Sequence, residues 1–340
     1  MNPDVLRFPA EWEPQSAVLI AWPHADTDWA ERLGEVEETY IALVAAIARF
    51  EGVLICVADD DVEAYARARL SSARVDMRQV RFVPIAYDDT WLRDSGPITL
   101  RGGEAFRLMD FRFTGWGGKF EAALDSATTS KLDWNVPVES VPLVMEGGSL
   151  EINSHGQLLT TRYCLMNPNR NPQLSQADVE AQLEKHLGAT QVWWLNHGDL
   201  EGDDTDAHID TLARFCDDST IAYVQCTDKV DSHYDELAKM EQELQALAAT
   251  HQLKLVPLPM TPALFDDDGQ RLPATYANFL IINGAVLLPV YGCDTDALAI
   301  SQMQKAFPNH DIVPIDCLSL TWQHGSLHCV TMQLPQGVRD

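Results

Sequence analysis

Short apolar segments alternate with longer amphipathic segments along almost the whole chain, and this alternation constrains the fold more than any other feature. The segment WAERLGEVEETYIALVAAIARF, residues 29–50, places apolar residues at steps of three and four, which predicts a helix. Segments such as VLICV and AVLLP are short and apolar, as is typical of buried strands. Strands that alternate with helices in this way predict an α/β protein.

The expected elements recur as strand–helix–strand units with irregular insertions. The expected strands are short and apolar and lie at residues 17–21, 53–57, 80–85, 158–161, 191–195, 221–225, 253–258, 279–282, 285–289 and 311–315. The expected helices share the helical apolar spacing and lie at residues 29–50, 61–71, 175–186, 231–250 and 294–306. No low-complexity or charge-block linker divides the chain, so we expect one domain over residues 1–340.

The charge balance restricts the partners of the chain. The formal net charge is −27, from 24 basic and 51 acidic residues, which argues strongly against nucleic acid as a partner. Such a surface would concentrate a small cation, although acidic side chains also simply solvate the exterior of many proteins. No G-x-G-x-x-G follows the first expected strand and no G-x-x-x-x-G-K-S/T occurs, so a nucleotide site has no support.

Neither a membrane segment nor a disulfide framework is expected. No run of eighteen apolar residues occurs, and the opening MNPDVLRFPAEWEPQ carries no secretion signal, so we expect a cytoplasmic protein. The seven cysteines form no C-x-x-C pair, which argues against zinc clusters and redox motifs. Four of them lie in apolar runs and are expected as buried strand residues: Cys56, Cys164, Cys226 and Cys317.

The segment YDDTWLRDSGP, residues 87–97, combines three aspartates with a tryptophan and an arginine before a turn. If residues 90–94 are extended, Trp91 and Arg93 share one face and Asp94 lies on the other. Asp94 would then stand at the end of a strand, where a loop could present it to a ligand. The alternative is a turn-forming aspartate beside a surface tryptophan.

The segment EGDDTDAHIDTLARF, residues 201–215, carries several acids before a His-x-Asp pair. In an extended segment, His208 and Asp210 would point the same way and could address one ligand. The pair could bind a metal, orient a base or cap the following helix. A metal site needs three or four convergent ligands, and no second histidine-rich segment stands out.

Two further segments carry candidate residues. In MEGGS, Glu146 precedes a glycine pair that would let the backbone approach a ligand closely. Arg170, in the loop NPNRNP, could bind an anion, but tying down the loop is the favoured role. In GSLHCVTMQLP, a cation near Cys329 would lower the thiol pKa from its usual value of about 8.5 and make it reactive. The alternative is a buried strand cysteine with a chance histidine, His328, beside it.

These segments, in the order TWLRDSGP, MEGGS, TTRYCLMNPNRNP, DAHIDTLARF and GSLHCVTMQLP, resemble the agmatine deiminase and bacterial-type peptidylarginine deiminase family. The resemblance runs from about residue 7 to residue 335. It implies a five-bladed, pseudo-symmetric α/β propeller with the active site on its central axis. It also implies hydrolysis of a guanidinium group to a ureido group with release of ammonia, without a metal or an organic cofactor.

The resemblance assigns roles to four residues. Cys329 matches the nucleophile and His208 the acid and base, while Asp94 and Asp210 match the carboxylates that hold the guanidinium. These residue types suit the chemistry, because carboxylates bind the planar guanidinium through paired, charge-assisted hydrogen bonds. His328 would point away from the Cys329 face if both lay in a strand, so we do not expect it to transfer protons.

Three further side chains are candidates for substrate binding. Trp91 could cover the guanidinium plane or the alkyl stem of the substrate. Asp204, or another acid of its group, could receive the far ammonium, and Glu146 is a candidate for the wall of the site. Agmatine is favoured as the substrate because acids cluster near the site and no basic residue is placed to bind an α-carboxylate.

The sequence leaves two points open: the shape of the pocket and the reaction that the site catalyses. The chain reads WQHGSLHC where many family members have a longer glycine run, and Ala207 stands where glycine is common, so the shape of the pocket is open. Deimination of arginine or peptidyl-arginine and amidino transfer would use the same four residues. A non-catalytic binder of cationic amines and a metal-dependent hydrolase built on His208, Asp210 and Asp94 also stay open. Assembly of the chain with copies of itself is open as well.

Overall fold

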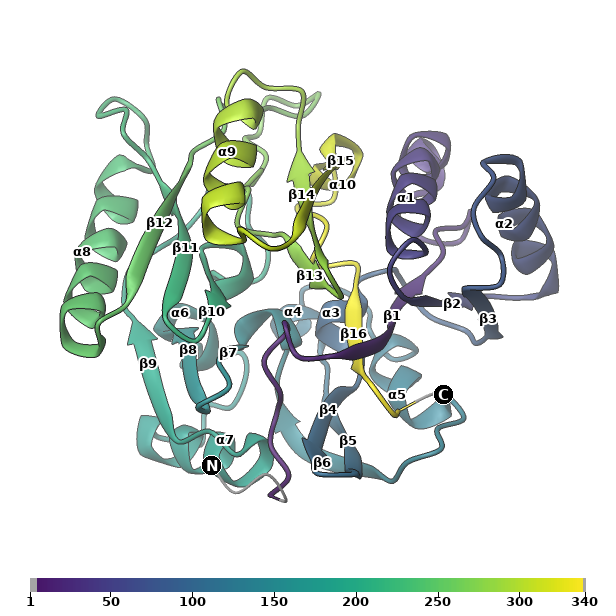
Figure 1. Cartoon of the computed structure of the whole chain (residues 1–340), viewed down its shortest axis with the longest axis horizontal. Helices are drawn as coiled ribbons and strands as arrows, with labels where there is room; N and C mark the ends of the chain where they lie inside the picture. The colour runs from purple at the N-terminus through teal and green to yellow at the C-terminus, as the bar shows by residue number, and fades with distance from the viewer. Residues whose placement is uncertain (1–4, 339–340) are drawn as a thin grey trace.

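The computed structural model describes residues 5–338, which form five small mixed sheets with helices packed on their outer sides (Figure 1). Four of the sheets have three strands, of which the first and second are antiparallel and the second and third are parallel. A parallel pair needs a crossover between its strands, and helical segments supply it in each unit. The α/β class and the recurring strand–helix–strand units are therefore confirmed.

The strands of the described residues are β1 (Gln15–Ala21), β2 (Gly52–Val57), β3 (Val80–Pro84), β4 (Ile98–Gly102), β5 (Ala105–Arg112), β6 (Val138–Val144), β7 (Glu151–Ile152), β8 (Gln157–Thr161), β9 (Gln191–Leu195), β10 (Ala213–Asp217), β11 (Thr220–Gln225), β12 (Lys254–Pro259), β13 (Leu280–Ile282), β14 (Ala285–Val290), β15 (Asp311–Asp316) and β16 (Met332–Pro335). The α-helices are α1 (Leu33–Ile47), α2 (Asp60–Ser72), α3 (Leu92–Ser95), α4 (Gly115–Gly118), α5 (Thr128–Lys131), α6 (Arg162–Leu165), α7 (Gln176–Leu187), α8 (Tyr234–His251), α9 (Asp296–Ala306) and α10 (Leu318–Thr321). Short 3₁₀ turns are η1 (Ala30–Arg32), η2 (Asp125–Ala127), η3 (Gly147–Ser149) and η4 (Ile209–Thr211).

The last strand, β16, joins the end of the chain to its beginning. It pairs antiparallel with β1, with Met332 opposite Leu19, and so forms the edge of the sheet β16-β1-β2-β3. Figure 1 shows β16 and α3 near the centre of the molecule, with the sheets arranged around them. The segment that precedes β16 is therefore held where several sheets meet.

Every strand expected from the sequence overlaps an observed strand, and the one expected at 191–195 matches β9 in both bounds. The apolar pattern did not reveal the sheet β4-β5-β6. In β5, AFRLMDFR interrupts apolar residues with charged ones, and the first half of β6 is largely exposed. Neither strand is a continuous apolar run, so both escape a search for buried strands.

The helix predictions are correct in position and less accurate at the ends. The helix expected at 29–50 begins with the turn η1 and ends at Ile47. The helix expected at 175–186 is α7, and Ser175 caps it. The Ser175 side chain accepts a hydrogen bond from the Asp178 backbone N–H, and the Asp178 side chain accepts one from the Ser175 backbone N–H. This reciprocal pair is a capping box.

The extended geometry expected around Asp94 is wrong. Residues 92–95 form the single helical turn α3, in which the Asp94 N–H donates to the Trp91 carbonyl at 3.1 Å. The extended geometry expected for His208 and Asp210 is also wrong, because η4 begins directly after His208. At both places one helical turn pairs backbone groups that an extended segment would leave unpaired.

Several predictions about cysteines are also corrected. Cys226 and Cys317 are buried as expected, but they directly follow β11 and β15 rather than lying within them. His328 and Cys329 lie in a turn before β16 rather than in a strand. Cys164 is buried in the short helix α6, because Thr161 ends β8 and caps that helix with its side chain. Cys56 lies in β2 as expected.

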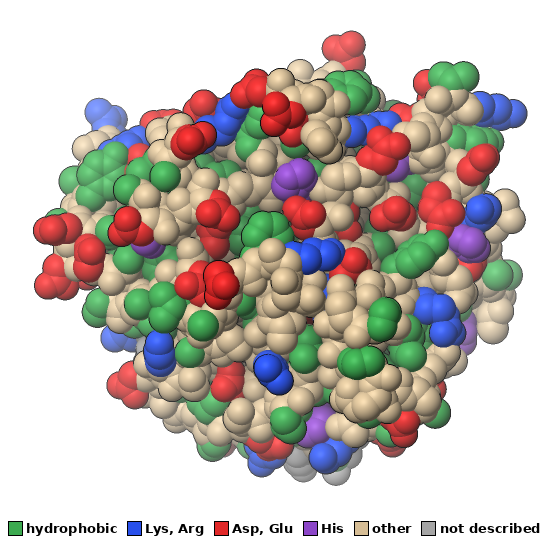
Figure 2. All heavy atoms as spheres, turned by 180° about the vertical axis from the view of Figure 1, so that it is seen from behind, with side chains coloured by type: hydrophobic (Ala, Val, Ile, Leu, Met, Phe, Trp, Pro, Cys, Tyr) green, Lys and Arg blue, Asp and Glu red, His purple; other side chains and the backbone are tan. Residues whose placement is uncertain are grey.

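The site rests on the apolar core. One cluster of buried residues contains the fully buried Trp22, Tyr40 and Phe279 and reaches Trp91 and Cys329 at the cavity. A tightly packed support of this kind limits side-chain movement. On the face opposite to that of Figure 1, acidic side chains are widely spread, with Lys and Arg scattered among them (Figure 2). Among residues 5–338, no helix has the length and apolar character needed to span a membrane.

Candidate active site

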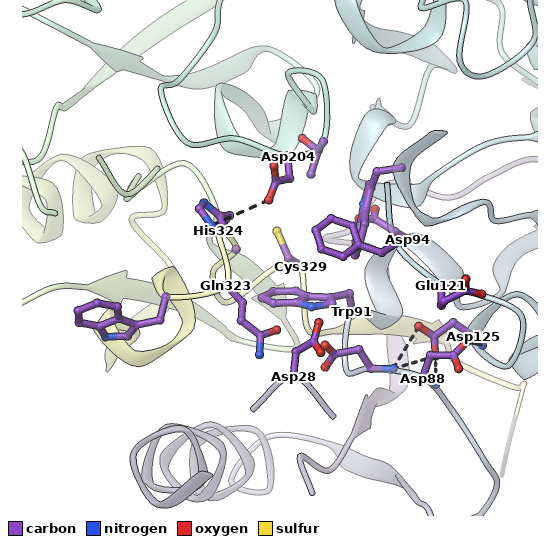
Figure 3. Close-up of a pocket in the computed structure, with 16 residues that line it drawn as sticks. Asp28, Asp88, Trp91, Asp94, Glu121, Asp125, Asp204, Gln323, His324 and Cys329 are labelled. Atoms are coloured by element: carbon purple, nitrogen blue, oxygen red, sulfur yellow. Dashed lines mark hydrogen bonds and ion pairs between the residues drawn. The ribbon is translucent and has the colours of Figure 1, made fainter. Parts of the chain in front are cut away.

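A cavity of about 510 Å³ opens beside the turn that carries Cys329, and Figure 3 shows the sulfur of Cys329 pointing into it. The cavity is lined by Asp28, Asp88, Asp89, Trp91, Asp94, Trp116, Phe120, Glu121, Asp125, Asp204, Thr205, Trp322, Gln323, His324, Gly325 and Cys329. Seven of these side chains are carboxylates, and none is Lys or Arg. The lining therefore suits a positively charged molecule.

Cys329 is held by backbone contacts on both sides. Its carbonyl accepts a hydrogen bond from the Arg93 N–H at 3.1 Å, and its own N–H donates to Asn278 Oδ1 at 3.3 Å. Burial raises the pKa of the thiol well above its ordinary value, and the carboxylates of Asp210 and Asp94 raise it further. Burial and the two carboxylates therefore favour the neutral thiol, whereas a cation bound beside it would favour the thiolate.

Asp94 is fixed by two donors from different elements. Its Oδ1 accepts a hydrogen bond from the Gly148 N–H at 2.9 Å, and its Oδ2 accepts one from Trp116 Nε1 at 2.9 Å. Burial raises the pKa of Asp94, and the neighbouring His208 acts in the opposite direction. The carboxylate is thus held in one orientation at the cavity wall.

Gly148 marks the point where the site side chains converge. A Cβ atom added there would lie 2.6 Å from His208 Nδ1, 2.9 Å from Asp94 Oδ1 and 3.1 Å from Asp210 Oδ2. His208 Nδ1 is itself 3.5 Å from Asp94 Oδ1. The structure therefore brings these three predicted site residues together, and it does so around a position that only glycine can occupy.

His208 is completely buried among acidic and thiol groups. Burial alone lowers its pKa, but the carboxylate of Asp94, the thiol of Cys164 and the carboxylate of Glu146 raise it well above the ordinary value. Neither ring nitrogen has a hydrogen-bond partner among the described residues. The raised pKa favours the protonated imidazole, which can donate a proton from a ring nitrogen.

Asp210 links the thiol to a second histidine. Its Oδ2 lies 3.8 Å from Cys329 Sγ and 2.8 Å from His328 Nδ1. Within residues 5–338, its Oδ1 is buried without a hydrogen-bond partner. Burial raises the pKa of Asp210, but the hydrogen bond from His328 and the nearby His208 lower it overall. Asp210 is therefore an ionised acceptor with one oxygen free.

Glu146 lies beside His208, and neither residue is part of the cavity lining. Its Oε1 is 2.7 Å from Arg170 Nε, and Arg170 Nη1 is 2.7 Å from Asp206 Oδ2. Arg170 therefore ties its loop to two acids, as expected for the structural role. Glu146, Cys164 and His208 bring ligand atoms within 4.8 Å of one another, but the adjacent Arg170 cation disfavours a metal ion there.

Trp91 and Asp204 line different parts of the cavity (Figure 3). The ring of Trp91 packs so closely on Gly325 that a Cβ there would lie 2.1 Å from Trp91 Cζ3. Asp204 is partly exposed, and its Oδ2 is 4.0 Å from His324 Nε2. Ala207 and His324, which depart from the family glycines, keep positive φ angles of 64° and 63°. The backbone that favours glycine is thus retained at both positions.

A group of acids at the cavity mouth was not recognised from the sequence. Asp125 Oδ1 accepts hydrogen bonds from the backbone N–H groups of Asp88 at 2.7 Å and Asp89 at 3.2 Å. Burial raises the pKa of Asp89 and of Asp125 to about 7. The negative charge at the mouth therefore increases as the pH rises through neutrality.

Two hydrogen-bonding residues of the site were also missed. Asn278, fully buried, accepts hydrogen bonds from the turn around Cys329, and nothing in its apolar segment signals this role. Trp116 donates to Asp94 from the segment GWGG, where its own φ is 54° and Gly117 has a φ of 85°. This glycine-rich run was the available signal of an unusual backbone at a site.

Comparisons with known proteins agree with this geometry. Residues 7–335 match the model of the family described as Porphyromonas-type peptidyl-arginine deiminase. Agmatine deiminase of Pseudomonas aeruginosa (strain LESB58) is 32% identical, with 98% of this chain and 96% of that protein covered. A Cys-to-Ser variant of C. jejuni agmatine deiminase with substrate bound has a TM-score of 0.92 at 35% identity, with 98% of both chains covered.

A structure from Porphyromonas gingivalis described as "Putative Arginine Deiminase" has a TM-score of 0.90 at 45% identity and covers 98% of this chain and 99% of its own. The family model spans almost the whole chain, and the fold and the site geometry are in accord with it. The chain belongs to the Porphyromonas-type peptidyl-arginine deiminase family.

Proposed function

We propose that this protein hydrolyses agmatine to N-carbamoylputrescine and ammonia. The observation that carries the proposal is a thiol beside two buried carboxylates, in a cavity with seven acidic side chains and no Lys or Arg in its lining. Agmatine has a guanidinium at one end and an ammonium at the other, with no carboxylate. Both ends therefore suit an acidic cavity.

The guanidinium would bind between Asp94 and Asp210. The free Oδ1 of Asp210 is a buried acceptor without a partner among the described residues, and a guanidinium N–H would satisfy it. Asp94, held by Gly148 and Trp116, would accept from another edge of the same plane. Trp91 would cover the alkyl stem or the guanidinium face.

The first step forms a bond between sulfur and carbon. The bound cation lowers the pKa of the Cys329 thiol, so the thiol releases its proton to solvent in the cavity and becomes the thiolate nucleophile. The thiolate adds to the guanidinium carbon and gives a tetrahedral adduct. His208 donates a proton to the departing nitrogen, ammonia leaves, and an amidino group remains on Cys329.

The second step releases the product. His208, now neutral, takes a proton from a water molecule, whose oxygen attacks the same carbon. The carbon–sulfur bond breaks and the thiolate leaves. The ureido product, N-carbamoylputrescine, keeps the other two nitrogens of the guanidinium and the distal ammonium. Glu146 favours the cationic form of His208. The acids of the cavity mouth, which include Asp204, would bind the distal ammonium.

We infer further properties from the resemblance and the recurring units. The five sheets fit the blades of a pseudo-symmetric propeller in a single catalytic domain over residues 1–340. The reaction needs no metal or organic cofactor, because the side chains supply the nucleophile, acid and base. A cytoplasmic location is proposed.

Ammonia release from agmatine, arginine and a blocked arginine peptide, measured side by side, tests the proposal. We expect the highest kcat/KM for agmatine and no loss of activity on addition of a chelator. Arginine is the main alternative substrate, because the relative at 45% identity is described as "Putative Arginine Deiminase". A higher kcat/KM for arginine would show that arginine is the substrate, and the proposed reaction steps would still apply. Transfer of the amidino group to an added amine in preference to water would indicate an amidinotransferase.

A further inference from the structure

His328 is buried between two carboxylates. Its Nδ1 lies 2.8 Å from Asp210 Oδ2, its Nε2 lies 2.7 Å from Glu11 Oε2, and 1% of the residue is exposed. A neutral imidazole has one N–H and can donate to only one of two ionised carboxylates. The two contacts together therefore require either an imidazolium or a protonated carboxyl group.

The surroundings of Glu11 favour its ionised form. Arg214 Nη2 donates to Glu11 Oε2 at 2.8 Å, and the Ile281 backbone N–H donates to Oε1 at 2.7 Å. Arg93 Nη2 lies 3.8 Å from the same carboxylate. Burial raises the pKa of Glu11, but Arg214 and His328 lower it below the usual range. Glu11 is therefore an acceptor, and Nε2 of His328 must donate to it.

The surroundings of Asp210 lead to the same conclusion for Nδ1. Besides His328 itself, the nearby His208 and Arg214 lower the pKa of Asp210 against the effect of burial, which favours the carboxylate. Because His328 Nδ1 lies at hydrogen-bond distance from this acceptor, 2.8 Å from Oδ2, it must also donate. The backbone at His328 is fixed as well, since its N–H donates to Asn278 Oδ1 at 2.8 Å. With both ring nitrogens and the backbone held, the ring fixes the rotation of the Asp210 carboxylate.

Neither His328 nor Asp210 is part of the cavity lining, but Asp210 Oδ2 lies 3.8 Å from Cys329 Sγ, which does line it. His328 would therefore act on the substrate through Asp210. Beyond Glu11, the charges continue to Arg214 and then to Glu151, whose Oε2 accepts from Arg214 Nε at 2.6 Å. Signs alternate along this series from Asp210 to Glu151, which we call the floor cluster. The proton on each ring nitrogen of His328 is what makes the alternation complete.

We propose that His328 is a positioning residue: a buried imidazolium, clamped between Glu11 and Asp210, that holds Asp210 ionised with one oxygen turned toward the substrate guanidinium. The inference rests on the proposed function, because the role concerns a guanidinium bound at Asp210. It also corrects the expectation that His328 points away from the Cys329 face, because both side chains contact Asp210.

A matched pair of variants tests this role. In His328→Asn the amide can still donate near the Nδ1 position to Asp210, whereas in His328→Gln the amide reaches toward Glu11 instead. We expect His328→Gln to raise KM for agmatine about 100-fold and His328→Asn about 10-fold or less, with kcat less affected. Equal losses in both variants, in parallel with lower thermal stability, would show a merely structural role and overturn the proposal.

The protonation state of the His328 ring can be measured by NMR, independently of enzyme activity. In wild-type protein labelled with ¹⁵N at histidine, the signals of His328 are those that disappear in His328→Asn among the ten histidines. We expect both ring nitrogens of His328 to carry protons near neutral pH, with or without agmatine. A neutral ring would overturn the proposal even if agmatine is hydrolysed. Failure of the wild-type protein to hydrolyse any guanidine would overturn the proposed function and leave the protonation result intact.

Discussion

The floor cluster and the mouth of the cavity differ in how their charged side chains are arranged: those of the floor cluster are paired with opposite charges, and those of the mouth are not. On the floor, Asp210, His328, Glu11 and Arg214 alternate in sign, with successive contacts of 2.7–2.8 Å. At the mouth, carboxylates such as Asp204 line the cavity without any Lys or Arg beside them in the lining. Buried charges are stable only when paired. At the mouth, Asp204 is partly solvated, and burial raises the pKa of Asp125, which is unpaired among the described residues, and so favours its neutral form. The floor therefore sets geometry, and the mouth sets attraction for a cation.

The largest expected effect comes from removing the nucleophile while the charged side chains of the floor cluster and the mouth stay in place. Replacing Cys329 by Ala should lower kcat for agmatine by about 10⁴-fold or more, because the nucleophile is lost while both carboxylates remain. Agmatine should still bind the variant, as calorimetry would show. Cys293→Ala, at a half-buried thiol outside the cavity, is the control and should keep full activity. Turnover by the Cys329 variant at the wild-type rate would remove the proposed mechanism.

The next effect concerns the stability of the floor. Arg214→Met should lower the free energy of unfolding by about 3 to 5 kcal/mol, because Glu11 and Glu151 would remain buried without their shared cation. Urea unfolding measures this difference. The matched control, Arg78→Met, removes an exposed ion pair and should leave the unfolding midpoint unchanged. Similar midpoints for the two variants would mean that the floor does not depend on paired charge.

The contribution of Asp125 at the mouth to the unfolding free energy should change with pH in the opposite direction to that of an acid in an ion pair. The pKa of Asp125 is raised to about 7 by burial, so the folded state binds this proton more tightly than the unfolded state. The stability that it contributes is present below about pH 4 and is lost as the pH rises toward 7. Asp125→Asn lacks this loss, so its unfolding free energy relative to wild type should increase by roughly 2 to 4 kcal/mol between pH 4 and pH 8.

Two observations would sharpen the pH result. The exposed Asp268→Asn should show a difference from wild type that does not change over the same pH range. A difference for Asp125→Asn that stays flat with pH, or falls as the pH rises, would contradict the assignment of a protonated acid at the mouth.

The smallest expected effect is on substrate capture. Asp204→Asn should raise KM for agmatine about 2- to 10-fold with little change in kcat, because one partly solvated charge near the substrate is removed. The effect should shrink at high salt. Glu184→Gln, on the exposed side of α7, is the control and should not change KM. A lower KM for agmatine in the Asp204 variant would contradict an attracting mouth.

The fold could be predicted from local pattern to a greater extent than the site. Apolar runs and helical spacing located most of the parallel strands and their crossovers, because these elements are buried on a regular period. The convergence of Asp94, His208 and Asp210 around Gly148 has no such period, since these positions lie in segments far apart in the sequence. Their roles followed from the family resemblance, and their proximity required the packing of sheets that no local pattern specifies.

His328 shows why local geometry misled the prediction. A strand would send His328 and Cys329 to opposite faces, but the chain forms a turn there, and both side chains contact Asp210. Asn278 gave no signal because its contacts depend on that same turn. A residue pair in a turn can share one partner, which no strand periodicity predicts.

The most direct test of the account is the covalent intermediate. Wild-type protein mixed with agmatine and quenched in acid during turnover, then digested and analysed by mass spectrometry, should carry a new adduct on the peptide that contains Cys329. Its mass should equal agmatine less ammonia, and it should be absent from Cys329→Ala and from peptides with the other six cysteines. Turnover without such an adduct, or an adduct on another cysteine, would contradict the central claim that this thiol attacks the bound guanidinium.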